Sequence, residues 1–176
     1  MTSTRTRHDR PRRRDRSPDD PIAVLRDWCE SRGWRAFPFQ EEVWRACSAG
    51  ESGLLHAPTG TGKTLAAWLG AIARSRESSG PGVRVVWITP LRALAADTVQ
   101  SLEHPLADLR GWLGRGWRVA SRTGDSSAAD RRRLRENWPE ALVTTPESLS
   151  ILLSLEDAHE IFAGLDTVVE IGRAHV

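Results

Sequence analysis

The sequence has only two cysteines and no long apolar run. Cys29 and Cys47 have no CxxC spacing and no histidine close by, which excludes a disulfide framework and a zinc site. A protein without disulfides suits a reducing compartment, so we expect a cytoplasmic location. No apolar segment approaches the roughly 18 residues of a membrane span, and the arginine-rich start lacks the apolar segment of a signal peptide. We therefore expect no membrane partner.

Lysine is scarcer still, because Lys63 is the only one in the chain. It lies near the end of the segment LLHAPTGTGKT, residues 54–64, in which a short apolar run leads into a glycine-rich loop. We expect residues 54–57 to form a buried strand, and the pattern from Leu65 to Ala73 to form a helix. A loop between such a strand and helix is typical of a phosphate-binding loop, although Ala57 stands where the GxxxxGK[ST] spacing has glycine.

This loop predicts a site for a polyphosphate, against the alternative of a glycine-rich turn with a chance lysine. Gly60 and Gly62 allow backbone conformations that turn several N–H groups toward one point, and the next helix adds its positive end. Lys63 is expected to contact the β- and γ-phosphates, and the Thr64 hydroxyl to bind Mg²⁺. The predicted loop contacts are Ala57, Thr59, Gly60, Thr61, Gly62, Lys63 and Thr64.

The segment before the loop predicts a contact with adenine. Pro38 starts an expected helix that ends near Gly50, and Gln40 lies in its first turn, just after Phe37 and Phe39. A glutamine amide can pair with N6 and N7 of adenine, and an aromatic ring can stack on the base. An ordinary amphipathic helix with an exposed glutamine is the alternative. The position before a phosphate loop favours the adenine contact, and hence ATP with Mg²⁺ as cofactors.

Beyond the loop, strands alternate with helices. We expect strands at residues 83–88, 117–121 and 141–144, and the continuous apolar character of the first suits a strand buried on both faces. Helical patterns run to Leu113, from Ala128 to Asn137, and onward from Pro146. This order predicts an α/β fold with a doubly wound parallel sheet, in which ligands bind at the carboxyl ends of the strands.

Three turns that follow these strands carry groups that bind phosphates. The turns read TPLRALA, RTGD and TTPESL, and each places hydroxyls, an arginine or a helix start at the end of a strand. Any one of them could be plain helix capping, since serine, threonine and aspartate are favoured caps. Their order after a phosphate loop favours a polynucleotide partner.

Together these motifs resemble motifs I, Ia, Ic and Ib of superfamily 2 helicases, in the segments APTGTGKT, ITPLRALAADT, RTGD and VTTPESLSILL. The chain is most similar to the large-helicase-related group and, through FPFQEEVW and SGLLHAPTGTGKTLAAW, to its ligase-associated DEXH-box branch. The resemblance implies the first RecA-like domain of an ATP-driven enzyme that unwinds DNA in repair. It implies that Gln40 reads adenine and that single-stranded or tailed duplex DNA contacts the residues Pro90, Arg92, Thr123, Gly124, Thr145 and Pro146.

The chain departs from the family after LDTVV, where the resemblance implies an Asp-Glu-x-His sequence. The sequence reads EIGRAHV instead, so Ile171 stands where the glutamate that activates water is expected. Glu170 is a poor substitute for the missing acidic residues. The codons GAG ATC GGA AGA GCA CAC GTC for this segment resemble a sequencing adapter read in frame. We therefore predict a disordered arginine-rich arm at residues 1–18, a C-terminally incomplete helicase domain at 19–169, and a non-native tail at 170–176.

Three functions are open at this point. The intact protein would be a DNA helicase or translocase, or an RNA-directed helicase, since strand contacts go largely to phosphates and sugars. The third is a nucleotide- or nucleic-acid-binding module without turnover. Transporter ATPases and small GTPases share the phosphate loop, but Gln40 and the three turns count against them.

Overall fold

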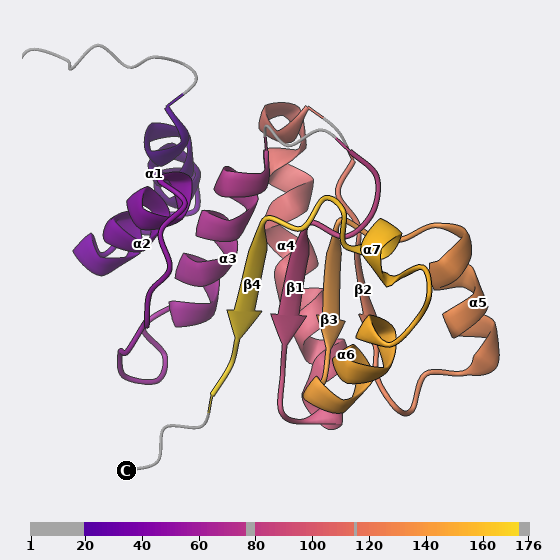
Figure 1. Cartoon of the computed structure of the whole chain (residues 1–176). Helices are drawn as coiled ribbons and strands as arrows, with labels where there is room; N and C mark the ends of the chain where they lie inside the picture. The colour runs from indigo at the N-terminus through magenta and orange to yellow at the C-terminus, as the bar shows by residue number, and fades with distance from the viewer. Residues whose placement is uncertain (1–19, 77–79, 115, 173–176) are drawn as a thin grey trace, which may run out of the picture.

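Four parallel strands form the centre of the computed structural model, which describes residues 20–76, 80–114 and 116–172 (Figure 1). The predicted arm at 1–18 lies outside these ranges. The sheet order is β2-β3-β1-β4, and every pair of neighbours is parallel. The strands are β1 (Val85–Ile88), β2 (Val119–Arg122), β3 (Ala141–Thr144) and β4 (Thr167–Glu170). The predicted α/β fold with a parallel sheet is confirmed.

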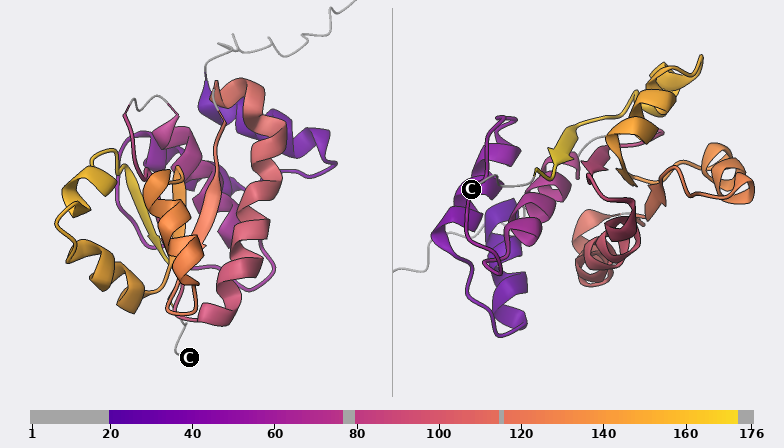
Figure 2. Two further views of the ribbon diagram at one scale, coloured as in Figure 1. Left: turned by 90° about the vertical axis from the view of Figure 1, so that its right-hand side faces the viewer. Right: turned by 90° about the horizontal axis from the view of Figure 1, so that it is seen from below.

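Helices cover both faces of this sheet (Figures 1 and 2). On one face the core joins α1, α2, α3 and α4 to β1, β2 and β3, and on the other it joins α6 and α7 to β1 and β3. The helices are α1 (Pro21–Ser31), α2 (Pro38–Ser48), α3 (Lys63–Ser75), the 3-10 turn η1 (Arg92–Leu94), α4 (Ala95–Leu113), α5 (Ala128–Glu136), α6 (Pro146–Leu153) and α7 (Ala158–Ile161). None of the described helices is long and apolar enough to cross a membrane.

Three tryptophans anchor the core beneath α3. Trp68 meets Trp87 and Trp117 edge to face, with ring centroids 6.3 and 6.1 Å apart. The Trp68 indole N–H donates to the Leu102 carbonyl oxygen at 2.8 Å, so its one polar atom is satisfied in the core. These contacts fix α3, the helix that follows the glycine-rich loop, against the sheet and α4.

Local signals set the helix boundaries as predicted. Asp20 caps α1 by accepting the Ile22 N–H at 3.0 Å, and Pro21 and Pro38 occupy the first positions of α1 and α2. Gly33 and Gly50, which follow these helices, have φ of +74° and +76°, a conformation that favours glycine. Several expected ends differ slightly, because β1 begins at Val85, β2 covers Val119–Arg122 and α5 ends at Glu136.

The strand expected at residues 54–57 is wrong. No strand forms there, and the Leu54 side chain is 95% exposed. A strand needs a neighbour for its backbone hydrogen bonds, and the only described partner of β4, at the nearer edge of the sheet, is β1. The apolar run alone therefore could not determine a strand.

Candidate functional site

The glycine-rich loop turns into α3 through two left-handed residues. Gly60 and Gly62 have φ of +79° and +80°, and Gly62 is the N-cap of α3. Residues with a Cβ adopt this conformation at a cost, so both positions favour glycine, as the sequence predicts. The Thr61 hydroxyl donates to the Pro58 carbonyl oxygen at 2.8 Å and closes the turn between them.

The Lys63 ammonium group points back into this loop. It donates hydrogen bonds to the carbonyl oxygens of Ala57 and Pro58, at the start of the loop. Thr59 and Thr64 are exposed, and Ala57 is half-buried. A single positive charge thus lies inside a ring of backbone at a helix N-terminus, an arrangement that suits a phosphate group.

Gln40 connects α2 to the same loop. Its side-chain oxygen accepts the Phe37 N–H at 2.9 Å, and its amide nitrogen donates to the Gly62 carbonyl oxygen at 3.3 Å. The residue is only 5% exposed, so the alternative of an exposed glutamine is wrong. The amide keeps one lone pair and one N–H for a further partner. Phe37, which is 54% exposed, stacks on Phe39 beside it.

The three turns predicted to contact a polynucleotide lie together at the carboxyl ends of the strands (Figure 1). The strand register aligns Ile88, Arg122 and Thr144, the last residues of β1, β2 and β3. Arg92 from the first turn pairs with Asp125 from the second at 3.3 Å. Its guanidinium also packs against Gly124, where a Cβ would come within 2.9 Å of it.

The third turn contributes Glu147 to the same charged cluster. Its pKa lies below the ordinary value of a glutamate, first because its own backbone N–H and the Thr145 hydroxyl hydrogen-bond the carboxylate, and also because Arg92 is near. Arg92 therefore pairs with the Asp125 carboxylate and also lowers the pKa of Glu147 through its charge. Neither Asp125 nor Glu147 was among the residues predicted from the sequence, although both occur within the motifs RTGD and TTPESL.

Two predicted hydroxyls are already used inside the fold. Thr145 is 1% exposed and caps α6, since its hydroxyl accepts the Ser148 N–H at 3.4 Å. Thr123 is 9% exposed, and its hydroxyl accepts the Asp125 N–H at 3.4 Å. Pro90, Arg92 and Pro146 are exposed, so they offer the accessible surface of the three turns.

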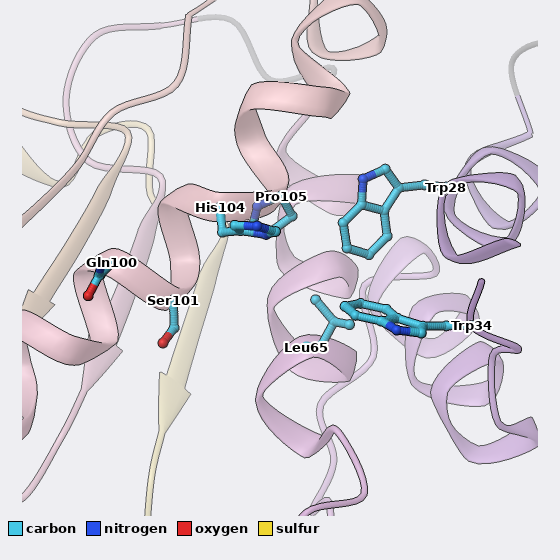
Figure 3. Close-up of a pocket in the computed structure, with 7 residues that line it drawn as sticks. All are labelled: Trp28, Trp34, Leu65, Gln100, Ser101, His104 and Pro105. Atoms are coloured by element: carbon cyan, nitrogen blue, oxygen red, sulfur yellow. The ribbon is translucent and has the colours of Figure 1, made fainter. Parts of the chain in front are cut away.

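A pocket of about 370 Å³ lies between α1, α3 and α4. Figure 3 shows the residues that line it. Trp28 and Trp34 meet edge to face there, with ring centroids 5.9 Å apart. None of the residues predicted from the sequence lines this pocket, which is bordered by Trp28, Trp34, Leu65, Gln100, Ser101, His104 and Pro105.

Within residues 20–76, 80–114 and 116–172, no group of three or more histidine, cysteine, aspartate or glutamate side chains could hold a metal ion. Thr64, exposed at the second position of α3, is the one predicted Mg²⁺ ligand. A hydroxyl together with nucleotide phosphates fits Mg²⁺, which keeps several of its waters when it binds.

A family model for DEAD/DEAH box helicases matches residues 37–169, which include the loop, Gln40 and all three turns. The chain belongs to the DEAD/DEAH box helicase family. Among its relatives, the Lhr helicase/probable uracil glycosylase of Mycolicibacterium smegmatis is 38% identical over 85% of this chain. The Lhr helicase/uracil glycosylase of Escherichia coli is 35% identical over 86%. The chain spans 11% of the length of each of these two relatives.

Solved helicase structures share the fold. The Mycobacterium smegmatis helicase Lhr, bound to single-stranded DNA and AMP-PNP, superposes with a TM-score of 0.72 at 36% identity, over 86% of this chain and 20% of that one. The helicase MrfA, bound to DNA and AMPPNP, gives a TM-score of 0.65 at 23% identity over 88% of this chain and 21% of its own. The described domain therefore has the RecA-like α/β fold of these helicases.

Proposed function

We propose that this chain is the N-terminal, ATP-binding part of an ATP-dependent DNA helicase or translocase that acts in DNA repair. The observation that carries this proposal is the joining of Gln40 to the glycine-rich loop through the Gly62 carbonyl. That bond places an amide able to read adenine directly beside a loop able to hold phosphates. A relative at 36% identity was solved with single-stranded DNA and AMP-PNP, which supports the same pair of ligands here.

In this proposal, ATP and Mg²⁺ bind at residues 57–64. The Lys63 ammonium leaves the carbonyl oxygens of Ala57 and Pro58 to contact the β- and γ-phosphates, and the Thr64 hydroxyl becomes a ligand of Mg²⁺. The free N–H and lone pair of the Gln40 amide pair with adenine. The bound Mg²⁺ would draw charge from the phosphates during hydrolysis.

The same proposal places the DNA strand across the three turns, at the carboxyl ends of β1, β2 and β3. Arg92 contacts a phosphate, and the exposed backbone and rings at Pro90, Gly124 and Pro146 border the strand. Because Thr123 and Thr145 are buried and their hydroxyls are already bonded, their role in this proposal is to shape the turns that the strand meets. The chain alone is proposed to bind without hydrolysis, since Ile171 cannot activate water.

An RNA-directed helicase is the second candidate. The turns offer groups for phosphates and sugars, which RNA also carries. An RNA helicase, DExH12 of Arabidopsis thaliana, is 30% identical over 65% of this chain and 5% of its own length. The ATPase rate of the full-length protein, measured with single-stranded DNA and with RNA of the same sequence, separates the two candidates. Greater stimulation by RNA would contradict the DNA proposal.

The nucleotide site is tested by Lys63→Ala in the full-length protein. We expect ATP affinity to fall at least tenfold, because the only positive charge in the loop is removed. Titration with a fluorescent ATP analogue measures this change. The control is Arg74→Ala, near the far end of α3. Unchanged affinity in Lys63→Ala would show that the loop does not bind the phosphates.

A further inference from the structure

In the described part of the chain β2 is an edge strand of the sheet, and a groove along it is lined by residues of α4, β2 and α5. The ribbons of these elements can be followed in Figure 2, left. The groove has a volume of about 510 Å³, and Ala120 and Ser121 of β2 line it. At the carboxyl end of β2 the groove includes Arg92 and Thr123, which belong to the proposed strand path. It continues past these residues to Arg118, at the opposite end of β2. The groove therefore extends that path along the side of the sheet.

The wall formed by α5 is positively charged. The helix has the sequence AADRRRLRE, with four arginines against one aspartate and one glutamate. Arg133 is exposed and lines the groove, and in the described part of the chain no carboxylate lies within salt-bridge distance of it. Arg132, one position earlier, pairs with Glu136 at 3.6 Å and does not line the groove.

The carboxylates in the groove already have partners. Asp125 pairs with Arg92 at 3.3 Å, and Asp130 accepts a hydrogen bond from the Ser127 hydroxyl at 2.6 Å. This hydrogen bond is the main cause of the lowered pKa of Asp130, and the nearby charge of Arg133 also contributes to it. Arg122 is the last residue of β2. Its pKa lies below the ordinary value, first because the side chain is buried and then because the positive charges of Arg131 and Arg135 are near. The groove is lined by Arg92, Arg118 and Arg133 against Asp125 and Asp130, so its net charge is positive, which suits an anionic ligand.

We propose that this groove binds the sugar-phosphate backbone of the nucleic-acid strand beyond the three turns, with Arg133 as a phosphate contact. The inference rests on the proposed function, because it continues the same strand. The Ser121 hydroxyl and the Asn137 amide also line the groove and suit phosphate or sugar oxygens. Four residues of β2 at about 3.3 Å each span about 13 Å. That length holds about four stacked nucleotides at roughly 3.4 Å each.

An extended protein segment that pairs with the free edge of β2 is a different occupant for the same groove. Such a segment would need backbone groups along β2 and would gain little from arginines on α5. The charge of the α5 wall and the continuity with Arg92 favour the nucleic acid. The two occupants predict different effects of Arg133 on DNA binding.

The test compares Arg133→Ala with Arg132→Ala in the full-length protein. The binding constant for oligothymidylate is measured against salt concentration, with one strand long enough to fill the groove and one shorter by about four nucleotides. We expect Arg133→Ala to weaken binding of the long strand about fivefold and to lower the salt slope by about 0.7, the value for one single-strand phosphate contact. Arg132→Ala should match the unaltered protein on both strands.

Arg133→Glu is the second variant, and its melting temperature is compared with that of the unaltered protein to check that the fold is retained. It should weaken binding of the long strand further and leave the short strand unaffected. Equal salt slopes in Arg132→Ala and Arg133→Ala would overturn the proposal, and this is the result expected if a protein segment occupies the groove. Failure of the unaltered protein to bind either strand would instead overturn the proposed function as well.

Discussion

Gly62 is required both for its backbone conformation and for its lack of a side chain. Its positive φ allows the chain to enter α3, and its missing side chain leaves room for the Gln40 amide. A Cβ at this position would come within 2.8 Å of the Gln40 amide nitrogen. Gly60 has nearly the same φ, but a Cβ there would meet no atom within 4 Å. An alanine at Gly60 would therefore meet only backbone strain, whereas an alanine at Gly62 would meet the same strain and also crowd the Gln40 amide.

This difference predicts unequal effects of alanine. We expect Gly60→Ala to lower the free energy of unfolding by about 1 kcal/mol, the cost of a left-handed alanine. Gly62→Ala should cost more and should also weaken ATP binding, because it displaces Gln40. Denaturant unfolding and nucleotide titration of both variants measure these effects. In a Gln40→Ala background the two substitutions should become equal in stability, and a persistent difference there would contradict this account.

At the scale of elements, an ion pair holds α1 against α2. The Arg26 guanidinium donates two hydrogen bonds of 2.8 Å to the Glu41 carboxylate, and Arg45 donates a third at 2.6 Å. The hydrogen bonds from Arg26 are the main reason that the pKa of Glu41 lies below its ordinary value. A lowered pKa in the folded state stabilises the protein above the ordinary pKa. That contribution disappears as the pH falls through the lowered value.

Glu41→Gln is therefore expected to lower the free energy of unfolding at pH 7 by about 1 kcal/mol, the range of a half-exposed ion pair with good geometry. At about pH 3, below the ordinary pKa of glutamate, the difference from the unaltered protein should be smaller, because the contribution is lost as the pH falls through the lowered pKa. Urea unfolding at the two pH values measures the change. The control is Glu42→Gln, an exposed neighbour, which should have little effect at either pH. A loss that is the same at both pH values would show that the charge is not the cause.

The sequence alone predicts those elements whose signals are local. Pro21 and Pro38 start helices, Gly33 and Gly50 follow their ends, and the apolar run at residues 83–88 contains the buried strand β1. The strand at 54–57 could not be predicted correctly, because strand formation depends on a neighbour that is remote in sequence.

The same limit holds for the candidate site. The loop glycines follow from the spacing of the motif, but the pairing of Arg92 with Asp125 joins residues 33 positions apart. Burial of Gln40 and the use of the Thr145 hydroxyl as a cap depend on how helices pack and end. Composition and spacing identify these side chains as candidate ligand contacts. Only the three-dimensional structure shows which of their atoms are accessible.

At the scale of the whole molecule, β4 leaves an open edge. In the described part of the chain it pairs only with β1, and its Val168 side chain is 54% exposed. Unpaired strand edges with apolar side chains promote association between chains. We therefore expect the isolated 176-residue chain to self-associate as its concentration rises, as measured by light scattering or sedimentation.

Val168→Lys should reduce this association, because a charge on an edge strand opposes pairing with another edge. Ile151→Lys is the matched control, since Ile151 is 55% exposed but lies on α6. If both substitutions reduce association equally, surface apolarity in general is responsible. If neither does, the open edge of β4 is not the site of association.

The unpaired segment at residues 54–57 also has a thermodynamic consequence for ATP. At its other end the glycine-rich loop is anchored in α3, but before Ala57 no strand fixes it. Any polypeptide segment that pairs with residues 54–57 would order the loop and so raise its affinity for the nucleotide. By reciprocity, a nucleotide that prefers the ordered loop must favour that pairing by the same free energy. If the loop binds ATP as proposed, pairing of residues 54–57 with a strand and occupancy of the loop would be linked in one coupled equilibrium.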